Sequence, residues 1–511
     1  MFIEIDKLSI KRLIGQMIIA RLNIEDYLQD QQYKENIFKL IKIGVGGFCL
    51  FQGNKVNTMK VIHELNEYAP IPLIFSGDYE HGLTMRLDDG TSFPHSMALG
   101  NSKYPNATYE VAKAISKEIK ELGIHWNFAP VCDINSNIDN PIINIRAFGE
   151  DVETVNKNLI EYIKASEEEK VISCAKHFPG HGDTSIDSHL SLPAINKTLN
   201  QLRKLELKPF IEAIKCNVPS IMIAHIALPE IDESIPASLS SKVCNSLLRQ
   251  ELKYEGIIIT DALEMKAIVD NYKCEEIAEM GLNADIDVFL MPENPIKLIE
   301  SIQNLVSKNV DFEFKIKNSA QRILNLKEKY NVFDKLQLQN TFKINLDFPQ
   351  LALETAISSL KISGDLNLIP INEETKITGI AILQDDNIEI PSTFFNMLTS
   401  AIENEISLGF IDKNVTNRDI DDLVRDTFLT DLFIFPIFIR SKAYQGSVGI
   451  HPNLIKAIRE IKGFKPAIII FFGNPYLEEK IEAELKILTY SDSLPSMAAT
   501  VVKLSGREAG V

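Results

Sequence analysis

Seven short apolar segments alternate with helical segments along the first two-thirds of this 511-residue chain. Each apolar segment has the length and composition of a buried strand. Such an alternation is typical of a parallel sheet that helices cover on both sides. The predicted strands are residues 45–51, 71–76, 125–131, 171–175, 220–224, 256–260 and 286–291. The opening segment, residues 1–22, is instead predicted to be an amphipathic helix because its charges recur at helical spacing.

Polar residues follow the carboxyl ends of five different predicted strands. These residues are Asp78, Asp133, Lys176 with His177, His225 and Asp261. In a TIM barrel the carboxyl ends of all strands converge on one rim, where the active site lies. An open, doubly wound sheet concentrates its ligands near one switch point and does not use so many strand ends. The pattern therefore predicts an α/β fold, a TIM-like (β/α)8 barrel in which one strand is degenerate.

A second alternation of strands and helices follows a stretch without sustained period at residues 336–350. Its predicted strands are residues 377–383, 406–411, 432–438, 467–472 and 485–490. We therefore expect a TIM-barrel catalytic domain over residues 1–335, a linker over 336–350 and a smaller open α/β sandwich domain over 351–511. The sequence contains neither a P-loop nor a GxGxxG motif, so nucleotide binding is not predicted.

The composition is that of an ordinary globular protein, with 45% apolar and 24% charged residues. The formal net charge of −17 disfavours nucleic acid and anionic membranes as main partners. The six cysteines are scattered, mostly inside apolar segments, and form no CxxC pair, as is typical of reduced thiols in a cytosolic protein. The opening residues lack the features of a signal peptide, and no apolar segment approaches the length of a membrane span. A cytoplasmic location is therefore expected.

Ionisable side chains crowd the polar loop that follows the predicted strand at residues 171–175. The loop holds three of the nine histidines within thirteen residues, and its ionisable members are Lys176, His177, His181, Asp183, Asp187 and His189. Imidazoles and carboxylates at short range shift one another's pKa values, which supplies an acid and a base near neutral pH. The alternative is a strand-to-helix connection whose Asp and His side chains cap helix ends. The crowding favours function over that alternative.

Two features could supply a nucleophile and a proton donor. Asp261 directly follows an apolar strand at the rim, although the same position also suits a helix cap. Asp187 and His189 are two residues apart, so the carboxylate could hold the imidazole in one tautomer and raise its basicity. A nucleophilic carboxylate and a separate proton donor are the minimum equipment of a retaining glycosidase.

These motifs resemble the family 3 glycoside hydrolases, specifically their β-N-acetylglucosaminidase branch. The most specific match is KHFPGHGDT at residues 176–184, followed by the Asp-Ser-His of residues 187–189. Residues 260–265, with the sequence TDALEM, are similar to the nucleophile motif of that branch. Segments around residues 78–82, 127–133 and 146–151 are similar to its sugar-binding segments. The resemblance covers residues 8–330 strongly and the second predicted domain only in short pieces.

The resemblance implies a mechanism, a substrate and a set of site residues. Asp261 attacks the anomeric carbon and forms a covalent glycosyl-aspartate, while His189, oriented by Asp187, serves as acid and base. The residues implied to hold the sugar are Asp78, Arg146, Lys176, His177 and His225. The implied substrate is a terminal β-linked N-acetylglucosamine of peptidoglycan fragments (muropeptides) in cell-wall recycling. No cofactor or metal is expected.

Three alternatives remain beside this interpretation. A histidine acid places no second negative charge beside an incoming anion, so phosphate could replace water, as in a β-N-acetylglucosaminide phosphorylase. A metal-dependent hydrolase could use the histidines and aspartates of residues 177–189 with His225, but no HxH or HExxH spacing fixes two ligands on one element. A non-catalytic sugar-binding protein is less favoured because both Asp261 and His189 are present.

Overall fold

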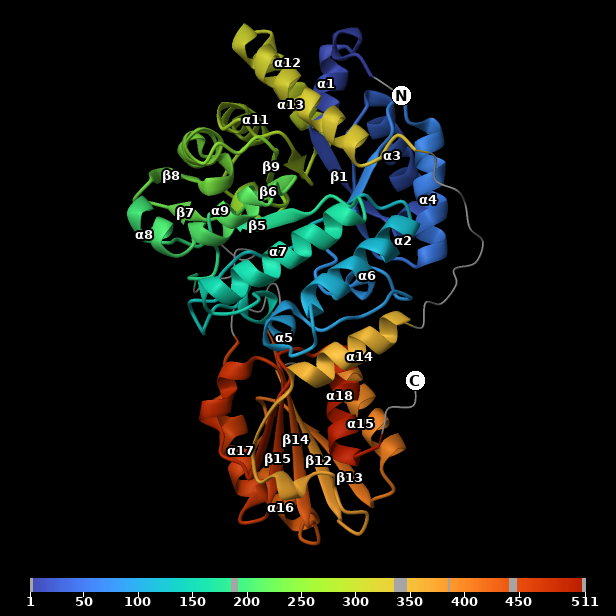
Figure 1. The fold of residues 1–511 in the computed structure, drawn as a ribbon, viewed down its shortest axis with the longest axis vertical. Coiled ribbons are helices and arrows are strands. Elements are labelled where there is room, and N and C mark those ends of the chain that lie inside the picture. Colours follow the sequence, from blue (N-terminus) through green and yellow to red (C-terminus); the bar gives the residue numbers. More distant parts are fainter. Residues whose placement is uncertain (1–2, 185–191, 335–346, 385–386, 441–447, 508–511) are drawn as a thin grey trace. The chain divides into compact units, whose positions relative to one another are not determined.

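The computed structural model describes residues 3–184, 192–334, 347–384, 387–440 and 448–507, coloured from blue to red along the chain in Figure 1. The chain divides into two compact units. The first unit comprises residues 1–91, 108–137 and 150–344, and the second comprises residues 92–107, 138–149 and 345–511. Most of the predicted linker lies outside the described residues.

The first unit is a barrel of parallel strands. Among its described residues one sheet has the order β10-β1-β2-β3-β4 and a second has the order β5-β6-β9. Bridges between Trp126 and Ile172 and between Ile259 and Val288 join the two sheets at both edges. The strands are β1 (Ile18–Asn23), β2 (Gly47–Phe51), β3 (Ile74–Gly77), β4 (Trp126–Asn127), β5 (Cys174–Phe178), β6 (Ser220–Ile223), β9 (Ile257–Thr260) and β10 (Phe289–Leu290). The predicted TIM-like fold is confirmed.

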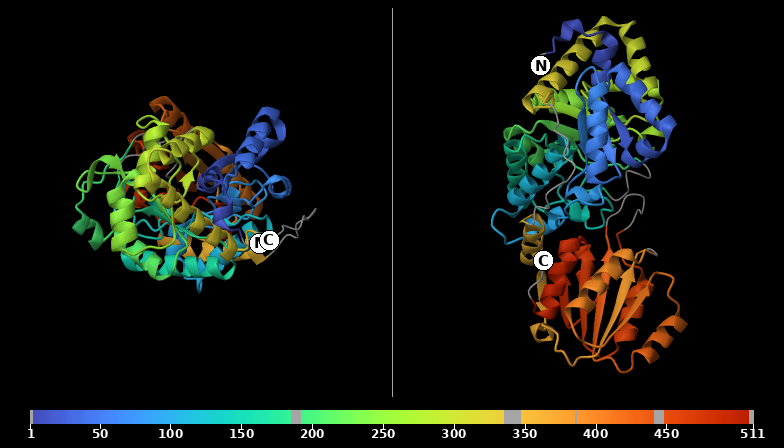
Figure 2. Two further views of the ribbon diagram at one scale, coloured as in Figure 1. Left: turned by 90° about the horizontal axis from the view of Figure 1, so that it is seen from above. Right: turned by 90° about the vertical axis from the view of Figure 1, so that its right-hand side faces the viewer.

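Helices cover the outside of these strands (Figures 1 and 2). The main ones are α1 (Ile10–Gln16), α3 (Gln31–Ile43), α4 (Lys55–Tyr68), α6 (Ala107–Glu121), α7 (Val152–Glu168), α9 (Leu207–Lys215), α11 (Cys274–Asn283), α12 (Pro295–Val306) and α13 (Val310–Lys329). Side-chain caps fix where several begin, because they satisfy backbone N–H groups that have no partner inside the helix. Asp30 caps α3, Asn54 caps α4 and Asp151 caps α7.

The smaller helical elements of the first unit connect the strands. They are η1 (Ile5–Lys7), α2 (Ile24–Gln29), η2 (Leu83–Met85), α8 (Leu199–Lys204), η4 (Ala237–Leu239), a π-helix (η5, Lys242–Glu251) and α10 (Lys266–Val269). A short antiparallel pair, β7 (Ala227–Leu228) and β8 (Asp232–Pro236), follows β6. No helix among the described residues of either unit is both long and apolar enough to cross a membrane.

The opening segment differs from its prediction as one helix. Helix α1 ends at Gln16, and strand β1 begins two residues later at Ile18. Ile18 and Ile19 are buried, and β1 pairs with β2 on one side and β10 on the other. A β-branched apolar segment with a strand on each side is more stable as part of the sheet than as a continuation of the helix. This strand supplies the eighth member of the barrel within the described residues.

The second unit is a mostly parallel sheet with helices on both faces, which confirms the predicted α/β sandwich (Figure 2, right). In its described residues the strand order is β11-β16-β15-β14-β12-β13, with β11 antiparallel to β16. Its strands are β11 (Lys361–Gly364), β12 (Ile377–Leu383), β13 (Ile406–Ile411), β14 (Leu432–Ile439), β15 (Ala467–Gly473) and β16 (Leu485–Leu488). Its helical elements are α5 (Ser96–Asn101), η3 (Asn144–Arg146), α14 (Asp347–Ser359), η6 (Leu366–Leu368), α15 (Glu389–Ala401), α16 (Asn417–Asp426), α17 (Pro452–Lys462), η7 (Pro475–Lys480) and α18 (Leu494–Ser505).

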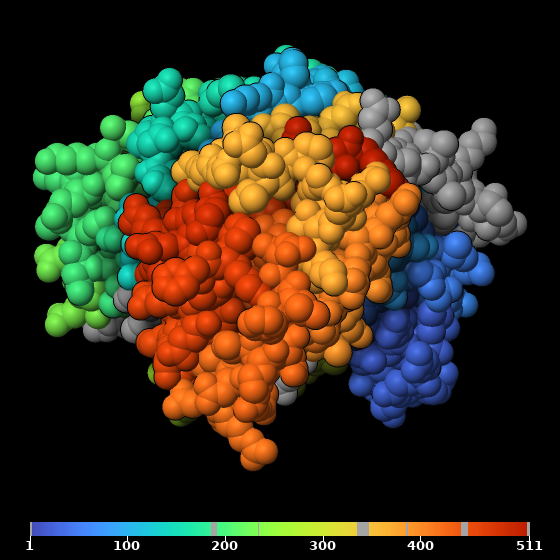
Figure 3. Space-filling view, turned by 90° about the horizontal axis from the view of Figure 1, so that it is seen from below, coloured from blue at the N-terminus to red at the C-terminus, as the bar shows by residue number. Residues whose placement is uncertain are grey.

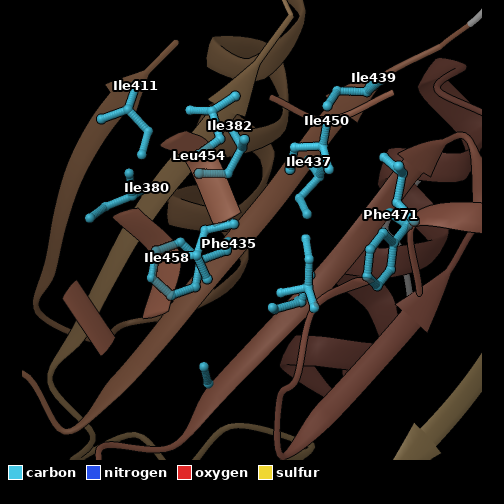
Figure 4. Close-up of a cluster of buried hydrophobic side chains, with 14 of the residues drawn as sticks. Ile380, Ile382, Ile411, Phe435, Ile437, Ile439, Ile450, Leu454, Ile458 and Phe471 are labelled. Carbon is cyan, nitrogen blue, oxygen red and sulfur yellow. The ribbon is translucent and has the colours of Figure 1, made fainter. Parts of the chain in front are cut away.

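Successive residues of the second sheet bury their side chains on opposite faces, as a pleated strand requires. Ile380 and Ile382 of β12 pack with Phe435 of β14 against Leu454 and Ile458 of α17 (Figure 4). The intervening residue of β12, Ala381, belongs to the opposite cluster, which contains side chains of α15 and α18.

The surface of the second unit also carries large apolar side chains. Most of this unit is coloured orange to red in Figure 3. Phe428 and Leu429 precede β14 and Phe464 precedes β15, and all three are exposed. Lys465 lies over the Phe428 ring, with 5.8 Å between its Nζ and the ring centroid.

Candidate active site

Four strands of the barrel, β3, β5, β6 and β9, place ionisable groups at their carboxyl ends. Asp78 follows β3, Lys176 and His177 lie in the last residues of β5, His225 follows β6 and Asp261 follows β9. Because parallel strands of a barrel end at the same rim, these groups gather on one face of the first unit.

Strand β5 extends beyond the predicted segment at residues 171–175 and includes Lys176 and His177. Its pairing with β6 shifts register between Ala175 and Phe178. A bulge of this kind re-aims side chains, and bulges are frequent at the rims of barrels and beside active sites. Lys176 and His177 therefore owe their orientation to an irregularity that the apolar pattern does not predict.

Lys176 is a buried cation between two carboxylates. Its Nζ lies 2.9 Å from Asp78 Oδ1 and 2.7 Å from Glu80 Oε1, and the residue is only 1% exposed. Arg86 Nη2 lies 2.6 Å from the other oxygen of Asp78. Burial raises the pKa of Asp78, but the charges of Lys176 and Arg86 outweigh it and hold that pKa below its ordinary value. The four formal charges sum to zero, and their hydrogen bonds keep Asp78 ionised and fixed.

A second buried carboxylate, Asp133, organises the histidine loop. Its Oδ2 accepts a hydrogen bond from the His177 backbone N–H at 3.1 Å and lies 2.7 Å from His177 Nδ1. Its Oδ1 accepts a hydrogen bond from the His181 backbone N–H at 2.6 Å. Burial raises the pKa of Asp133, but His177 and these hydrogen bonds lower it further, so the carboxylate stays ionised. An ionised carboxylate at Nδ1 fixes the tautomer of His177 with the proton on that nitrogen.

The neighbouring histidine of the loop is neutral near pH 7. Burial, followed by the charge of His177, lowers the pKa of His181 to about 4. Its Nδ1 lies 2.8 Å from Thr184 Oγ1. His177 and His181 therefore differ in electrostatic environment although they are four residues apart.

Glycines allow this loop to pack against the segment that carries Asp133. A Cβ atom at Gly182 would lie 1.6 Å from the backbone oxygen of Ile134, so no larger residue fits there. Asn137 anchors the same stretch, because its backbone N–H donates to Gly182 O at 3.3 Å and its Nδ2 donates to Thr184 O at 3.2 Å. Gly182 is thus required by close backbone approach.

Asp261 is half-buried at the end of β9. Its backbone N–H donates to Ile223 O at 3.0 Å, and its Oδ1 accepts a hydrogen bond from Ala262 N–H at 2.8 Å. His225 is fully buried and supports the same turn, since its Nε2 lies 3.0 Å from Ala262 O and its Nδ1 lies 2.7 Å from Ser238 Oγ. Strand pairing and His225 together fix the carboxylate at the rim.

The remaining predicted site residues belong to the second unit or are not described. Arg146 ends η3, where its Nη1 donates to Ile142 O at 3.2 Å, and it belongs to the second unit. Asp187 and His189 lie outside the described residues. No group of three or more His, Cys, Asp or Glu side chains within the described ranges is arranged to hold a metal ion.

Three side chains at this rim were not predicted as site residues: Glu80, Arg86 and Phe51. The guanidinium carbon of Arg86 lies 4.9 Å from the centroid of the Phe51 ring, and that of Arg21 lies 4.0 Å from it. Arg21 also pairs with Glu264 at 2.5 Å, three residues after Asp261. Glu80 stands in the predicted 78–82 motif, but nothing in the sequence pairs Arg86 with Asp78.

Residues 9–326 match the glycosyl hydrolase family 3 N-terminal domain. The chain belongs to glycosyl hydrolase family 3. The match includes the whole of the rim described above and confirms the family that the motifs predicted.

Relatives and solved structures agree with this assignment. Beta-hexosaminidase A of Pseudoalteromonas piscicida is 33% identical over 372 residues, which cover 66% of this chain and 62% of that protein. A beta-N-acetylglucosaminidase/beta-glucosidase of Cellulomonas fimi is 26% identical, with 68% of this chain and 64% of that protein covered. This chain thus spans less than two-thirds of the length of either relative.

A solved structure matches both units of the chain. The family 3 beta-N-acetylglucosaminidase from Paenibacillus sp. str. FPU-7 aligns with a TM-score of 0.85 at 26% identity, over 98% of this chain and 97% of that one.

Proposed function

We propose that this family 3 protein is a retaining exo-β-N-acetylglucosaminidase that cleaves terminal β-linked N-acetylglucosamine. The observation that carries the proposal is Asp261, a carboxylate fixed at the same barrel rim as the neutralised Asp78–Lys176 cluster. The names of the relatives support the same activity, since beta-hexosaminidase or beta-N-acetylglucosaminidase is the name of each.

In the proposed first step Asp261 attacks the anomeric carbon, the glycosidic bond breaks, and a glycosyl ester forms. The hydrogen bond from Ala262 N–H and the strand pairing of residue 261 hold the carboxylate in place for that attack. His189, oriented by Asp187, gives its proton to the leaving oxygen. In the second step the same imidazole removes a proton from water, which attacks the ester and releases the sugar.

The proposed sugar-binding residues offer charged hydrogen-bonding partners. Asp78 is held ionised between two cations, and Lys176 is buried beside it, so both suit hydroxyl groups of a sugar. His177 has its tautomer fixed by Asp133 and can present its other nitrogen. Arg146 and His225 complete the proposed set, with His225 acting in part through the turn that carries Asp261.

The proposed natural substrates are peptidoglycan fragments, in which N-acetylglucosamine is β-linked to a muramic acid derivative. The proposed location is the cytoplasm, where such internalised muropeptides would be recycled. All six cysteines are unpaired, and three of the buried ones (Cys49, Cys174 and Cys244) have pKa values raised chiefly by burial. Unpaired, unreactive thiols suit a reducing compartment.

Comparison of nitrophenyl β-N-acetylglucosaminide with nitrophenyl β-glucoside tests this proposal. A pocket with polar partners for an amide leaves them unsatisfied when a plain glucoside binds, so kcat/KM should strongly favour the N-acetyl sugar. Comparable values would place the protein with β-glucosidases and remove the peptidoglycan interpretation. Analysis of the product in phosphate buffer decides the acceptor, because phosphorolysis would release the sugar 1-phosphate in place of the free sugar.

A further inference from the structure

Strand β13 forms one edge of the second sheet, since β12 is its only partner among the described strands (Figure 1). The pairing is parallel, and Ile377 N–H donates to Glu405 O at 3.0 Å. The backbone groups of successive residues in a strand point to opposite sides, so those of Ile406, Leu408 and Phe410 point away from β12. None of these outward backbone groups is hydrogen-bonded to another described residue.

This edge lacks the features that keep edge strands from pairing with other chains. Proteins protect such edges with charged residues, proline, bulges or very short strands. The sequence ISLGFI of β13 has no charge and no proline, and it pairs with β12 over six residues without a shift in register. Leu408 is 45% exposed and Phe410 is 38% exposed. The opposite edge is protected by contrast, because β11 has only four residues and begins with the exposed Lys361.

The edge is complementary to itself when two copies run antiparallel about a two-fold axis at Gly409. Only a register that opposes two outward-pointing residues forms the ladder hydrogen bonds, and this register opposes Leu408 to Phe410 in both halves. On the other face of the sheet it opposes Glu405 to Lys413, again twice. The Glu405 side chain is 78% exposed, and Lys413 is exposed just beyond the strand. The register that opposes Leu408 to itself would set Glu405 against an apolar residue and lose both ion pairs.

We propose that β13 is a dimerisation edge: two copies of this chain pair their β13 strands antiparallel and join two six-stranded sheets into one. Such an interface uses the same patch on both copies, as most closed dimers do. The paired Leu408 and Phe410 side chains lie on the face of α15, where the Phe410 ring centroid is 5.8 Å from that of Phe395. A second copy is favoured over an unrelated strand because the apolar pair and the ion pair both repeat by symmetry. None of these residues belongs to the proposed catalytic set.

Light scattering of the full chain over a range of protein concentrations tests the dimer. The mass of the wild type should double as the concentration rises. Leu408→Lys places a charge opposite Phe410 and should stay monomeric over the same range, because a lysine on an edge strand opposes pairing. Phe464→Lys is the matched control, since it makes the same change at a fully exposed aromatic residue before β15 and should dimerise like the wild type.

Charge reversal tests the register. Glu405→Lys and Lys413→Glu should each raise the dissociation constant of the dimer about 3–30-fold, because two cross-strand pairs change from attraction to repulsion. The double variant should recover the wild-type constant, which a merely misfolded variant would not do. Gly409→Cys should form a disulfide between the two copies, because residue 409 faces itself across the axis. A Cβ atom there would lie 3.7 Å from Ile380 Cγ1, so the side chain fits.

Three results would overturn the inference. The wild type could stay monomeric at every concentration. The dimer could persist in Leu408→Lys, in which case another surface forms it. The double charge reversal could fail to recover the dimer while Gly409→Cys fails to cross-link, which excludes the two-fold pairing of β13.

Discussion

A buried lysine at the opposite end of the barrel gives the stability of the first unit a distinct pH dependence. Lys327 of α13 is fully buried, and its Nζ donates to Gln16 Oε1 and to Pro72 O, both at 2.7 Å. Burial lowers its pKa from 10.5 to about 7. The unfolded chain therefore binds this proton more tightly than the native state does.

The sign and the size of the effect follow from linkage. Below about pH 7 Lys327 is protonated in both the folded and the unfolded state. The folded state then bears the full free-energy cost of burying the charged ammonium, on the order of 5 kcal/mol. As the pH rises from about 7 toward 10.5 the native lysine is already neutral while the unfolded one still binds the proton, so the penalty shrinks. Between pH 7.5 and pH 9.5 this single group should raise the free energy of unfolding by about 2.5 kcal/mol.

The assay compares wild type with Lys327→Met by urea unfolding at those two pH values. The single tryptophan of the chain, Trp126, lies buried in β4, so its fluorescence reports the barrel. Wild type should gain about 2.5 kcal/mol over Lys327→Met between the two pH values. The difference in the free energy of unfolding between the two proteins at a single pH is less informative. Lys327→Met also leaves the Gln16 and Pro72 oxygens without their hydrogen-bond donor, and each loss destabilises the fold by about 1–3 kcal/mol.

Two results bear on this reasoning directly. Lys317→Met, which replaces a half-exposed lysine of the same helix, should leave the pH slope unchanged. If wild type and Lys327→Met have the same slope between pH 7.5 and 9.5, the lysine has an ordinary pKa in the folded protein and the reasoning is refuted.

Three predictions concern catalysis. Asp261→Asn should remove turnover almost completely and keep the folded signal of Trp126, because an amide cannot form the glycosyl ester; substantial residual rate would exclude it as nucleophile. His189→Ala should reduce kcat/KM far more for poor leaving groups than for activated phenolates, and an equal loss across the series would indicate another acid. Asp133→Asn places an amide against two N–H donors of His177 and should lower kcat/KM about 10–100-fold. This loss corresponds to the about 1.5–3 kcal/mol of a hydrogen bond to a charged group. Unchanged kinetics would show that His177 needs no carboxylate.

Because the carboxyl ends of parallel strands meet at one rim, polar residues that follow predicted strands are enough to predict much of that rim. Asp78, His225 and Asp261 follow strands whose apolar character is visible in the sequence, and parallel pairing brings them to one side. Lys176 and His177 were predicted at the same rim, but their orientation depends on the β5 bulge, which no apolar pattern encodes. Arg86 and Glu80 join this cluster through ion pairs with Asp78 and Lys176, which the sequence does not predict.

The elements missed by the sequence pattern have identifiable physical reasons. Strand β1 was hidden because its apolar run continues the helical spacing of α1, and only pairing on both sides makes it a strand. Strand β11 is a short, partly exposed antiparallel edge, so it lacks the apolar signal of the other strands of the second unit. Arg146 belongs to a short segment that clusters with the second unit, an association between distant residues that local periodicity cannot show.

Trapping of the glycosyl-enzyme tests the central claim most directly. A 5-fluoro-β-N-acetylglucosaminyl fluoride slows the breakdown of the intermediate more than its formation, so the covalent species accumulates. Mass spectrometry of the intact protein should show one added 5-fluoro-N-acetylhexosaminyl group, peptide mapping should place it on Asp261, and Asp261→Asn should acquire none. An adduct on another residue, or turnover of the reagent without any covalent species, would contradict the account.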